Sequence, residues 1–390
     1  MRIRQGSLEF APAQRKQAAT PSRSTSGSFN KLHSINKAFL PLLFIVCAFA
    51  SPALAHSLFV VARLSDTVAV IDDSTDQITT RIPVGDAPVR ISMSPDRLKA
   101  YVSNDTSATV SVLDTVALTT IATIQVGPHP QESAVTPDGG RLFLVHQATP
   151  TVTVIDTETN SVITNVVIGG HQAKDILFTL DGRFAYVANY TQAAVNVIDT
   201  ASDQVRTIPT GAGPRRLAIS PAGHRVFVTN NGADSVSAID TQTQQVIATI
   251  PVGHKPRGIA ITPSGDAIYV GNVQSGTVSI IDSSTLTVID TVPVGTKPWE
   301  VIITQDGTLA FVSSSVAGDV SVIDTATREV IKTLVTGDGS FFSAINPDGT
   351  KFYVSNTNDT TVSVIDIPSL TVVDVIPDVG SYPFDMAFGP

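Results

Sequence analysis

Three histidines in the first half of this 390-residue chain could ligate a metal ion or a haem iron. His129, His146 and His171 occur near two carboxylates, Glu132 and Asp175. Imidazole and carboxylate groups together form divalent-metal sites, and an imidazole can also be an axial haem ligand. The simpler interpretation is that these histidines are exposed loop residues, because no His-x-His or His-Glu-x-x-His spacing is present.

A second group of residues is suited to bind an anion. Five positive side chains and one aromatic side chain fall in three consecutive loops of similar sequence: Arg215, Arg216, Lys255, Arg257, Lys297 and Trp299. Guanidinium groups bind carboxylate or phosphate in bidentate fashion. We therefore expect an anionic small molecule, a sugar acid or an acidic chain as ligand; the alternative is that these charges pair with nearby acids such as Glu300.

The usual motifs of covalent catalysis and of phosphate or haem attachment are absent from the sequence. It contains no Gly-x-Ser-x-Gly, no Gly-x-x-x-x-Gly-Lys and no Cys-x-x-Cys-His. An active site assembled from distant loops would leave no such motif. The sequence therefore favours binding over catalysis, and no catalytic residue is assigned.

Both groups of residues belong to a repeat of about 42 residues that fills the chain after residue 55. An aspartate closes a short alternating apolar run once in each repeat: Asp72, Asp114, Asp156, Asp199, Asp240, Asp282, Asp324 and Asp366. An aromatic residue opens another run with the same period: Phe59, Tyr101, Phe143, Tyr186, Phe227, Tyr269, Phe311 and Tyr353. Eight repeats leave no residues for a second domain.

Each repeat contains four short β-branched runs that are closed by turn residues, which predicts a four-stranded antiparallel sheet. Sheets of this size at this period are typical of β-propeller blades. The chain after residue 55 opens with a second strand at Leu58 and ends with an innermost strand, 383–388. The sequence therefore predicts an all-β, eight-bladed propeller over residues 56–390, closed by N- and C-terminal strands that share one blade.

The repeat resembles that of the YVTN-repeat β-propeller family, which includes surface-layer and YncE-like secreted propellers. Tyr-Val-x-Asn or a close variant begins at Tyr101, Tyr186, Phe227 and Tyr353, and Val-Gly-x-x-Pro motifs and variants of Ser-Pro-Asp-Gly accompany it. The resemblance covers residues 57–390 and implies a propeller fold, with no shared catalytic residues. Many members have seven blades, so seven is the alternative count. Related propellers include lactonases and a haem domain of nitrite reductases, which implies possible enzymatic or haem-binding roles.

Residues common to most repeats are expected to be structural. The repeated Asp should cap the next turn, the Gly of Pro-Asp-Gly should be left-handed, and the Asn of Tyr-Val-x-Asn should take a left-handed or capping conformation. Function is expected where repeats differ. The position two residues after each loop proline, or its equivalent, should ring the channel mouth: Arg90, Glu132, Asp175, Arg216, Gly258, Glu300, Phe342 and Asp385. Phe342, with Phe341, is expected to pack, or to form a ligand wall.

Residues 1–55 are predicted to be a leader and a signal peptide that is cleaved after Ala55. The apolar run 38–50 is too short to span a bilayer. Cleavage would remove Cys47, which is the only cysteine, and would change the net charge from −9 to −15, because 25 − 7 basic and 34 − 1 acidic residues remain. An acidic protein without cysteine is expected to lack disulfides and to bind nucleic acid poorly.

These observations predict an exported, monomeric binding propeller in the periplasm, outside the cell or on its surface. Its top face would recognise a partner protein or an anionic ligand through Arg90, Glu132, Arg216, Phe342 and the basic loops. One alternative is a lactonase-like or haem-domain-like protein that uses the three histidines, although no cofactor is expected. The other alternative is a surface-layer or adhesion component.

Overall fold

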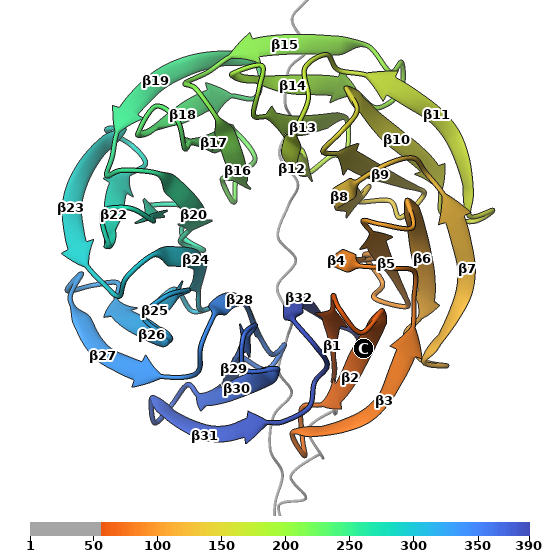
Figure 1. The fold of residues 1–390 in the computed structure, drawn as a ribbon. Coiled ribbons are helices and arrows are strands. Elements are labelled where there is room, and N and C mark those ends of the chain that lie inside the picture. The colour runs from red at the N-terminus through yellow and green to blue at the C-terminus, as the bar shows by residue number, and fades with distance from the viewer. Residues whose placement is uncertain (1–55) are drawn as a thin grey trace, which may run out of the picture. The chain divides into compact units, whose positions relative to one another are not determined.

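The computed structural model describes residues 56–390, which form a ring of eight four-stranded antiparallel sheets (Figure 1). The predicted eight-bladed propeller is therefore confirmed, and the seven-bladed alternative is wrong. The predicted leader and signal peptide lie outside the described residues. Every regular element of residues 56–390 is a β-strand, so no helix in this range is long and apolar enough to cross a membrane.

Each sheet runs from an innermost strand beside the axis to an outermost strand at the rim. The innermost strands are β4 (Pro88–Met93), β8 (Pro130–Val135), β12 (Ala173–Phe178), β16 (Pro214–Ile219), β20 (Pro256–Ile261), β24 (Pro298–Ile303), β28 (Ser340–Ile345) and β32 (Pro383–Phe388). The second strands are β1 (Ser57–Ala62), β5 (Lys99–Asn104), β9 (Arg141–His146), β13 (Phe184–Asn189), β17 (Arg225–Asn230), β21 (Ala267–Asn272), β25 (Leu309–Ser314) and β29 (Lys351–Asn356).

The third and fourth strands complete each blade. The third strands are β2 (Thr67–Asp72), β6 (Thr109–Asp114), β10 (Thr151–Asp156), β14 (Ala194–Asp199), β18 (Ser235–Asp240), β22 (Thr277–Asp282), β26 (Asp319–Asp324) and β30 (Thr361–Asp366). The outermost strands are β3 (Gln77–Pro83), β7 (Thr119–Gln125), β11 (Ser161–Val167), β15 (Val205–Pro209), β19 (Gln245–Pro251), β23 (Thr287–Pro293), β27 (Val330–Val335) and β31 (Thr371–Ile376).

The hydrophobic core lies between neighbouring blades. Second and third strands are buried on both faces, whereas outermost strands alternate exposed and partly buried residues, as β3 does. The aromatic residue of the repeat packs across each junction; Phe311 and Phe352, for example, stack with ring centroids 4.6 Å apart. Continuous burial of both faces explains why these strands are β-branched runs with little polar alternation.

The ring closes by pairing strands from the two ends of the domain. β32 adds to β1 as an antiparallel neighbour, with Leu58 opposite Phe388 and Val60 opposite Met386. Figure 1 shows β32 in the innermost place of the blade that contains β1, β2 and β3. The predicted closure is confirmed, and it leaves β1 without an exposed sheet edge.

Two of the three predicted structural roles of the repeat residues are confirmed. The Asp156 carboxylate accepts the backbone N–H groups of Glu158 and Thr159 at 3.0 and 2.7 Å, which caps the turn after β10. These bonds, together with the Thr159 hydroxyl, lower the pKa of Asp156. Gly139 of the Pro-Asp-Gly turn has a φ of 77°, as a left-handed turn residue should.

The predicted conformation of the repeated asparagine is wrong. Asn272, for example, is a fully buried last residue of β21 without a positive φ. Its side-chain amide donates to the hydroxyls of Thr277 and Ser279 at 3.1 and 2.9 Å, so it ties β21 to β22. The asparagine recurs between repeats because its buried amide donates to two hydroxyls of the neighbouring strand.

Candidate functional site

In seven of the eight innermost strands, two consecutive residues line the axial cavities at the end where the proline loops lie, and in β28 only Phe342 does. A β-bulge shifts the strand register just after the loop, as between Pro88 and Arg90 in β4 and between Pro214 and Leu217 in β16. The first residue after the proline, or its equivalent, forms what we call the mouth ring: Val89, Gln131, Lys174, Arg215, Arg257, Trp299, Phe341 and Phe384. The next residue forms the channel ring: Arg90, Glu132, Asp175, Arg216, Gly258, Glu300, Phe342 and Asp385.

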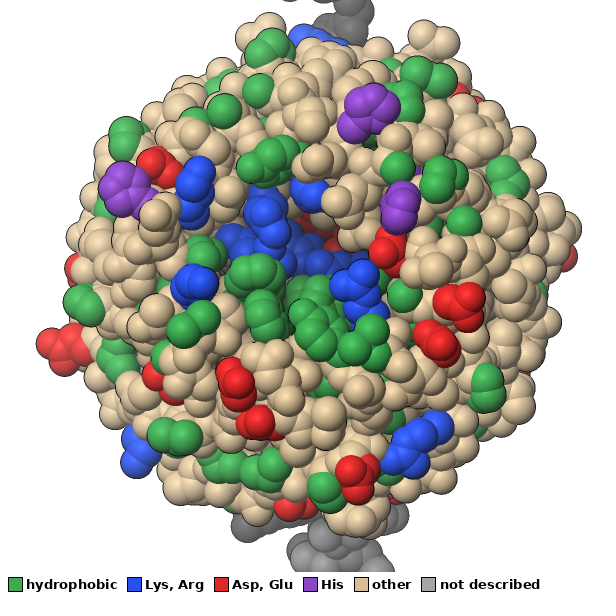
Figure 2. Space-filling view, in the orientation of Figure 1, with side chains coloured by type: hydrophobic (Ala, Val, Ile, Leu, Met, Phe, Trp, Pro, Cys, Tyr) green, Lys and Arg blue, Asp and Glu red, His purple; other side chains and the backbone are tan. Residues whose placement is uncertain are grey.

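The mouth ring is divided into a basic part and an aromatic part. Lys174, Arg215 and Arg257 come from β12, β16 and β20, and Trp299, Phe341 and Phe384 come from the next three innermost strands. Figure 2 shows Lys and Arg side chains gathered in the central hollow, with hydrophobic side chains beside them. The sequence of the ring thus places cations next to an apolar surface.

Arg257 and Trp299 meet where the basic and aromatic parts adjoin. The Arg257 guanidinium lies 3.4 Å from the centroid of the Trp299 ring, and Arg257 is only 5% exposed. Burial, and then the charges of Arg215 and Arg216, lower the pKa of Arg257 well below its ordinary value. Because an arginine stays protonated in a protein, Arg257 is a buried cation. The charge of Glu300 compensates it only in part, and Arg257 takes part in no ion pair among residues 56–390.

Three buried donors near the mouth have no hydrogen-bond partner among residues 56–390. They are Arg257 Nη1, Trp299 Nε1 and Arg90 Nη1. A buried donor without a partner costs about 1–3 kcal/mol, and more when it is charged. A ligand that brings acceptor oxygens or water would satisfy them.

The channel ring, by contrast, contains compensated charges. Arg216 Nη1 contacts Glu132 Oε2 at 2.9 Å and Asp175 Oδ1 at 3.4 Å, and Arg90 Nε contacts Glu132 Oε2 at 3.0 Å. The two carboxylates raise the pKa of Arg216 against the opposing effect of burial. Arg216 therefore has ion-pair partners in Glu132 and Asp175. Glu300, which the sequence suggested, adds a weaker attraction without an ion pair.

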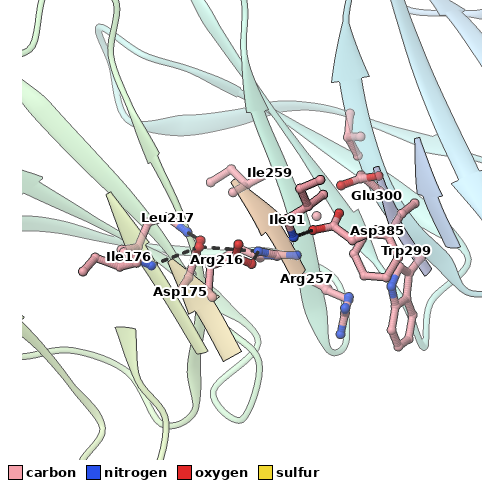
Figure 3. A pocket seen from close by; sticks show the side chains of 14 residues that line it. Ile91, Asp175, Ile176, Arg216, Leu217, Arg257, Ile259, Trp299, Glu300 and Asp385 are labelled. Atoms are coloured by element: carbon pink, nitrogen blue, oxygen red, sulfur yellow. Dashed lines mark hydrogen bonds and ion pairs between the residues drawn. The ribbon is translucent and has the colours of Figure 1, made fainter. Parts of the chain in front are cut away.

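Three channel-ring carboxylates link neighbouring blades. Asp175 accepts the N–H of Leu217 at 2.8 Å, Asp385 accepts that of Ile91 at 3.1 Å, and Glu300 accepts that of Ser343 at 2.7 Å. Each accepted N–H belongs to the innermost strand of the next blade. Figure 3 shows the Asp175 and Asp385 bonds on either side of Arg216. We call these three carboxylates the blade latches.

Burial raises the pKa values of all three blade latches. Glu300 is raised to about 7, and Arg216 and the Ser343 bonds oppose this rise only in part. Burial is also the largest cause for Asp175 and Asp385, with Arg216 opposing it for Asp175 and Arg90 for Asp385. These groups therefore titrate closer to neutral pH than ordinary carboxylates do.

Two connected cavities lie along the axis. The deeper cavity, of about 340 Å³, is lined by Glu132 and the three blade latches as well as by Arg216 and Arg257. The cavity at the mouth, of about 210 Å³, shares Arg216, Arg257 and Trp299 with it. Its charged lining is mainly basic: Arg63, Arg90, Lys174, Arg215, Arg216 and Arg257, with Asp105 as the acid. The charge thus changes from positive at the mouth to negative below it.

The structure brings together most of the predicted anion-binding residues and separates two of them. Arg90, Glu132, Arg215, Arg216, Arg257, Trp299 and Phe342 line one or both cavities. Lys255 and Lys297 are exposed left-handed loop residues, with φ of 56° and 58°, and line neither cavity. Phe342 packs against Phe384, with centroids 4.6 Å apart, and stacks with Arg90, so packing accounts for it.

Arg63 and Lys174 are cavity residues that the sequence interpretation missed. Lys174 occupies the mouth-ring position of its repeat, so comparing the residue directly after each loop proline would have identified it. Arg63 lies in the loop between β1 and β2, and its Nη2 contacts Asp105 Oδ2 at 3.2 Å. No feature of the sequence distinguishes Arg63 from the other basic loop residues.

The three histidines do not form a common site. His146 is buried, and its ring nitrogens contact the carbonyl oxygen of Pro128 at 3.1 Å and the hydroxyl of Thr153 at 2.8 Å. His129 contacts Asp105 and His171 contacts the carbonyl of Ala148, each at 3.1 Å. Burial lowers the pKa of His146. No group of three His, Cys, Asp or Glu residues in the described range could hold a metal ion.

A haem group does not fit the residues that line the two axial cavities. An axial ligand to haem iron is a histidine, cysteine, methionine or tyrosine side chain, and neither lining includes one. His146, one of the predicted ligands, uses both ring nitrogens within its own blade and its adjoining loop.

Comparisons with known proteins agree with the architecture. The solved structure of dihydro-heme d1 dehydrogenase NirN in complex with DHE has a TM-score of 0.73 and 17% identity, covering 85% of this chain and 74% of that chain. Hydrazine synthase of Kuenenia stuttgartiensis has a TM-score of 0.59 and 24% identity, covering 72% and 95%. A functionally unknown protein from Desulfotomaculum acetoxidans DSM 771 has a TM-score of 0.63 and 17% identity, covering 86% and 99%. These similarities show a shared fold.

No match is found among the curated proteins. The family model described as YNCE-like beta-propeller matches residues 161–309, which include the basic part of the mouth ring and Trp299. The eight blades extend the same repeat over the rest of residues 56–390. Residues 161–309 therefore match the YNCE-like propeller family, and the eight-bladed architecture of residues 56–390 is consistent with a YncE/YVTN-like propeller.

Proposed function

We propose that this protein is a binding propeller whose channel mouth takes a ligand that combines a carboxylate with an aromatic or apolar group. The carrying observation is the pair formed by the buried Arg257 and the half-buried Trp299, each of which has a buried donor atom without a partner in residues 56–390. The carboxylate would compensate the Arg257 and Arg215 charges, and the apolar group would lie against the aromatic part of the mouth ring.

The cavity sizes favour a small ligand or a single side chain. The deeper and mouth cavities have volumes of about 340 and 210 Å³. An acidic residue of a partner protein would offer the same carboxylate, so the proposed ligand includes an acidic segment of a partner protein. No reaction step is needed for this function, and we assign no catalytic residue.

The proposal includes export to the periplasm or beyond, as the predicted signal peptide suggests. Cleavage after Ala55 would leave His56 as the first residue. N-terminal sequencing of protein recovered from the periplasm or medium tests this part, and a retained residue 1–55 segment would contradict it.

Trp299 provides a direct measurement of binding, because it is the only tryptophan in the chain. We expect phenylacetate to change Trp299 fluorescence saturably, and the neutral amide phenylacetamide to do so only weakly. Arg257→Met should weaken phenylacetate binding roughly ten- to a hundredfold, since a hydrogen bond to a charged group contributes about 1.5–3 kcal/mol.

The matched control is Lys297→Met, which removes the same charge from an exposed loop that lines neither cavity. Its affinity for phenylacetate should stay close to that of the unmodified protein. Equal binding of phenylacetate and phenylacetamide, or unchanged binding by the Arg257→Met variant, would contradict the proposed carboxylate site.

A further inference from the structure

Lys174 is a cation among other cations at the channel mouth. It lines the mouth cavity with five arginines, Arg63, Arg90, Arg215, Arg216 and Arg257. Within residues 56–390 it takes part in no ion pair, and its Nζ lies 5.7 Å from the centroid of the Tyr190 ring. The acid in this cavity lining, Asp105, is engaged by Arg63.

These surroundings favour the neutral amine over the ammonium. Burial, followed by the charges of Arg215 and Arg257, lowers the pKa of Lys174 to about 8. At pH 7 such a lysine has on the order of a hundredfold more neutral amine than a lysine of ordinary pKa, about 10.4. A desolvated lysine beside other cations is a known arrangement for a nucleophilic amine.

The neighbouring guanidinium groups would determine which ligands bind beside the Lys174 amine. A carboxylate bound by Arg215 and Arg257, as in the proposed function, would hold its adjacent carbon beside the same cavity wall as Lys174. If that carbon is a carbonyl, the nucleophile and the electrophile share one cavity.

We propose that Lys174 captures the carbonyl group of a bound anion, a 2-oxo acid or an aldehyde that carries a carboxylate, as a reversible imine. This inference rests on the proposed function, because the arginines must first bind the carboxylate. It adds a covalent step and a substrate class to that site.

The step requires no oxidant or other co-reactant. The Lys174 ammonium loses a proton to solvent, and the free amine adds to the carbonyl carbon to give a carbinolamine after proton transfer from nitrogen to oxygen. Loss of the oxygen as water then forms the carbon–nitrogen double bond. Addition of water reverses the sequence and releases the anion unchanged.

Reductive trapping tests this step in the whole protein. Glyoxylate with sodium cyanoborohydride at pH 7 converts an imine into a stable secondary amine, which peptide mass spectrometry assigns to a lysine. We expect Lys174 to be labelled at least about tenfold faster than the exposed Lys255 and Lys297, because its lowered pKa increases its share of neutral amine and the arginines hold the glyoxylate carboxylate beside it. Acetaldehyde, which has no carboxylate, should show a smaller preference for Lys174, and phenylacetate should protect Lys174 from glyoxylate.

Lys174→Arg keeps the charge and provides the site control. This variant should lose the fast labelling at position 174. Phenylacetate binding by the unmodified protein in the Trp299 assay shows separately whether the anion site exists. Labelling of Lys174 at the rate of Lys255 and Lys297 would overturn the imine proposal and leave the anion site standing. Absence of phenylacetate binding would instead overturn the proposed function.

Discussion

Arg215 and Arg216 are adjacent on β16 and carry the same charge, but their surroundings differ. Arg216 contacts two carboxylates, whereas Arg215 takes part in no ion pair within residues 56–390 and lies 5.9 Å from the Trp299 ring centroid. Burial, and then the charge of Arg216, lower the pKa of Arg215 to about 10. The charge of Arg216 therefore stabilises the buried carboxylates of the folded protein, whereas the charge of Arg215 is available to a ligand.

Substitution of each arginine by methionine should separate these roles. Arg216→Met would leave Glu132 and Asp175 buried without their cation, and we expect the free energy of unfolding to fall by about 3–5 kcal/mol. Arg215→Met should leave stability nearly unchanged and weaken phenylacetate binding. Urea unfolding and Trp299 fluorescence titration of both variants check this, and equal stability losses would contradict the assignment.

The blade latches act at the scale of strands, because each joins the innermost strands of two neighbouring blades. Glu300 accepts both the N–H and the hydroxyl of Ser343, at 2.7 and 3.0 Å. Its pKa of about 7 in the folded protein exceeds the ordinary 4.5. Between these two pH values the folded state binds more protons than the unfolded state. The stability from Glu300 is therefore fully present below about pH 4.5 and is lost as pH rises to about 7.

Glu300→Gln should remove this pH dependence, because an amide keeps an acceptor oxygen but does not ionise. The stability of the variant relative to the unmodified protein should increase by about 1–3 kcal/mol from pH 5 to pH 8. Asp175 and Asp385 are present in both proteins, so the difference reports Glu300 together with its interaction with Asp385. Urea unfolding at the two pH values measures this difference in the free energy of unfolding. If the stabilities of the two proteins change equally with pH, Glu300 does not titrate in this range.

The strands themselves could be predicted from the sequence, whereas the contacts between blades could not. The repeated pattern marks the strand boundaries because it recurs eight times. The position two residues after each loop proline, or its equivalent, identified the channel ring. The β-bulge after that proline also turns the residue before the channel-ring position toward the axis. An interpretation based on strict alternation of side chains therefore missed Lys174. The pairing of Arg216 with Glu132, 84 residues away, depends on how blades are rotated about the axis, which no local pattern records. The buried role of Asn272 was missed because turn propensity describes exposed asparagines.

At the scale of the whole molecule, eight blades leave an axial channel wide enough for two cavities, and closure fixes which side chains line it. β32 supplies Phe384 to the mouth ring and Asp385 to the blade latches. It also covers the edge of β1, with which it pairs from Leu58 to Ala62. The C-terminal strand therefore contributes to both the site and the stability of the ring.

A chain that ends at Ser381 should consequently lose both ligand binding and the stability of the ring. Without β32 the blade of β1 lacks its innermost strand, and Leu58 and Val60 lose the covering contacts of Phe388 and Met386. We expect a much lower melting temperature and aggregation through the exposed β1 edge. A synthetic peptide of residues 382–390 should restore the melting temperature and phenylacetate binding by adding as a strand, and a scrambled peptide should not. If the shortened chain melts like the complete one, closure by β32 does not hold the ring together, because the remaining seven blades and the three-stranded sheet are then stable without it.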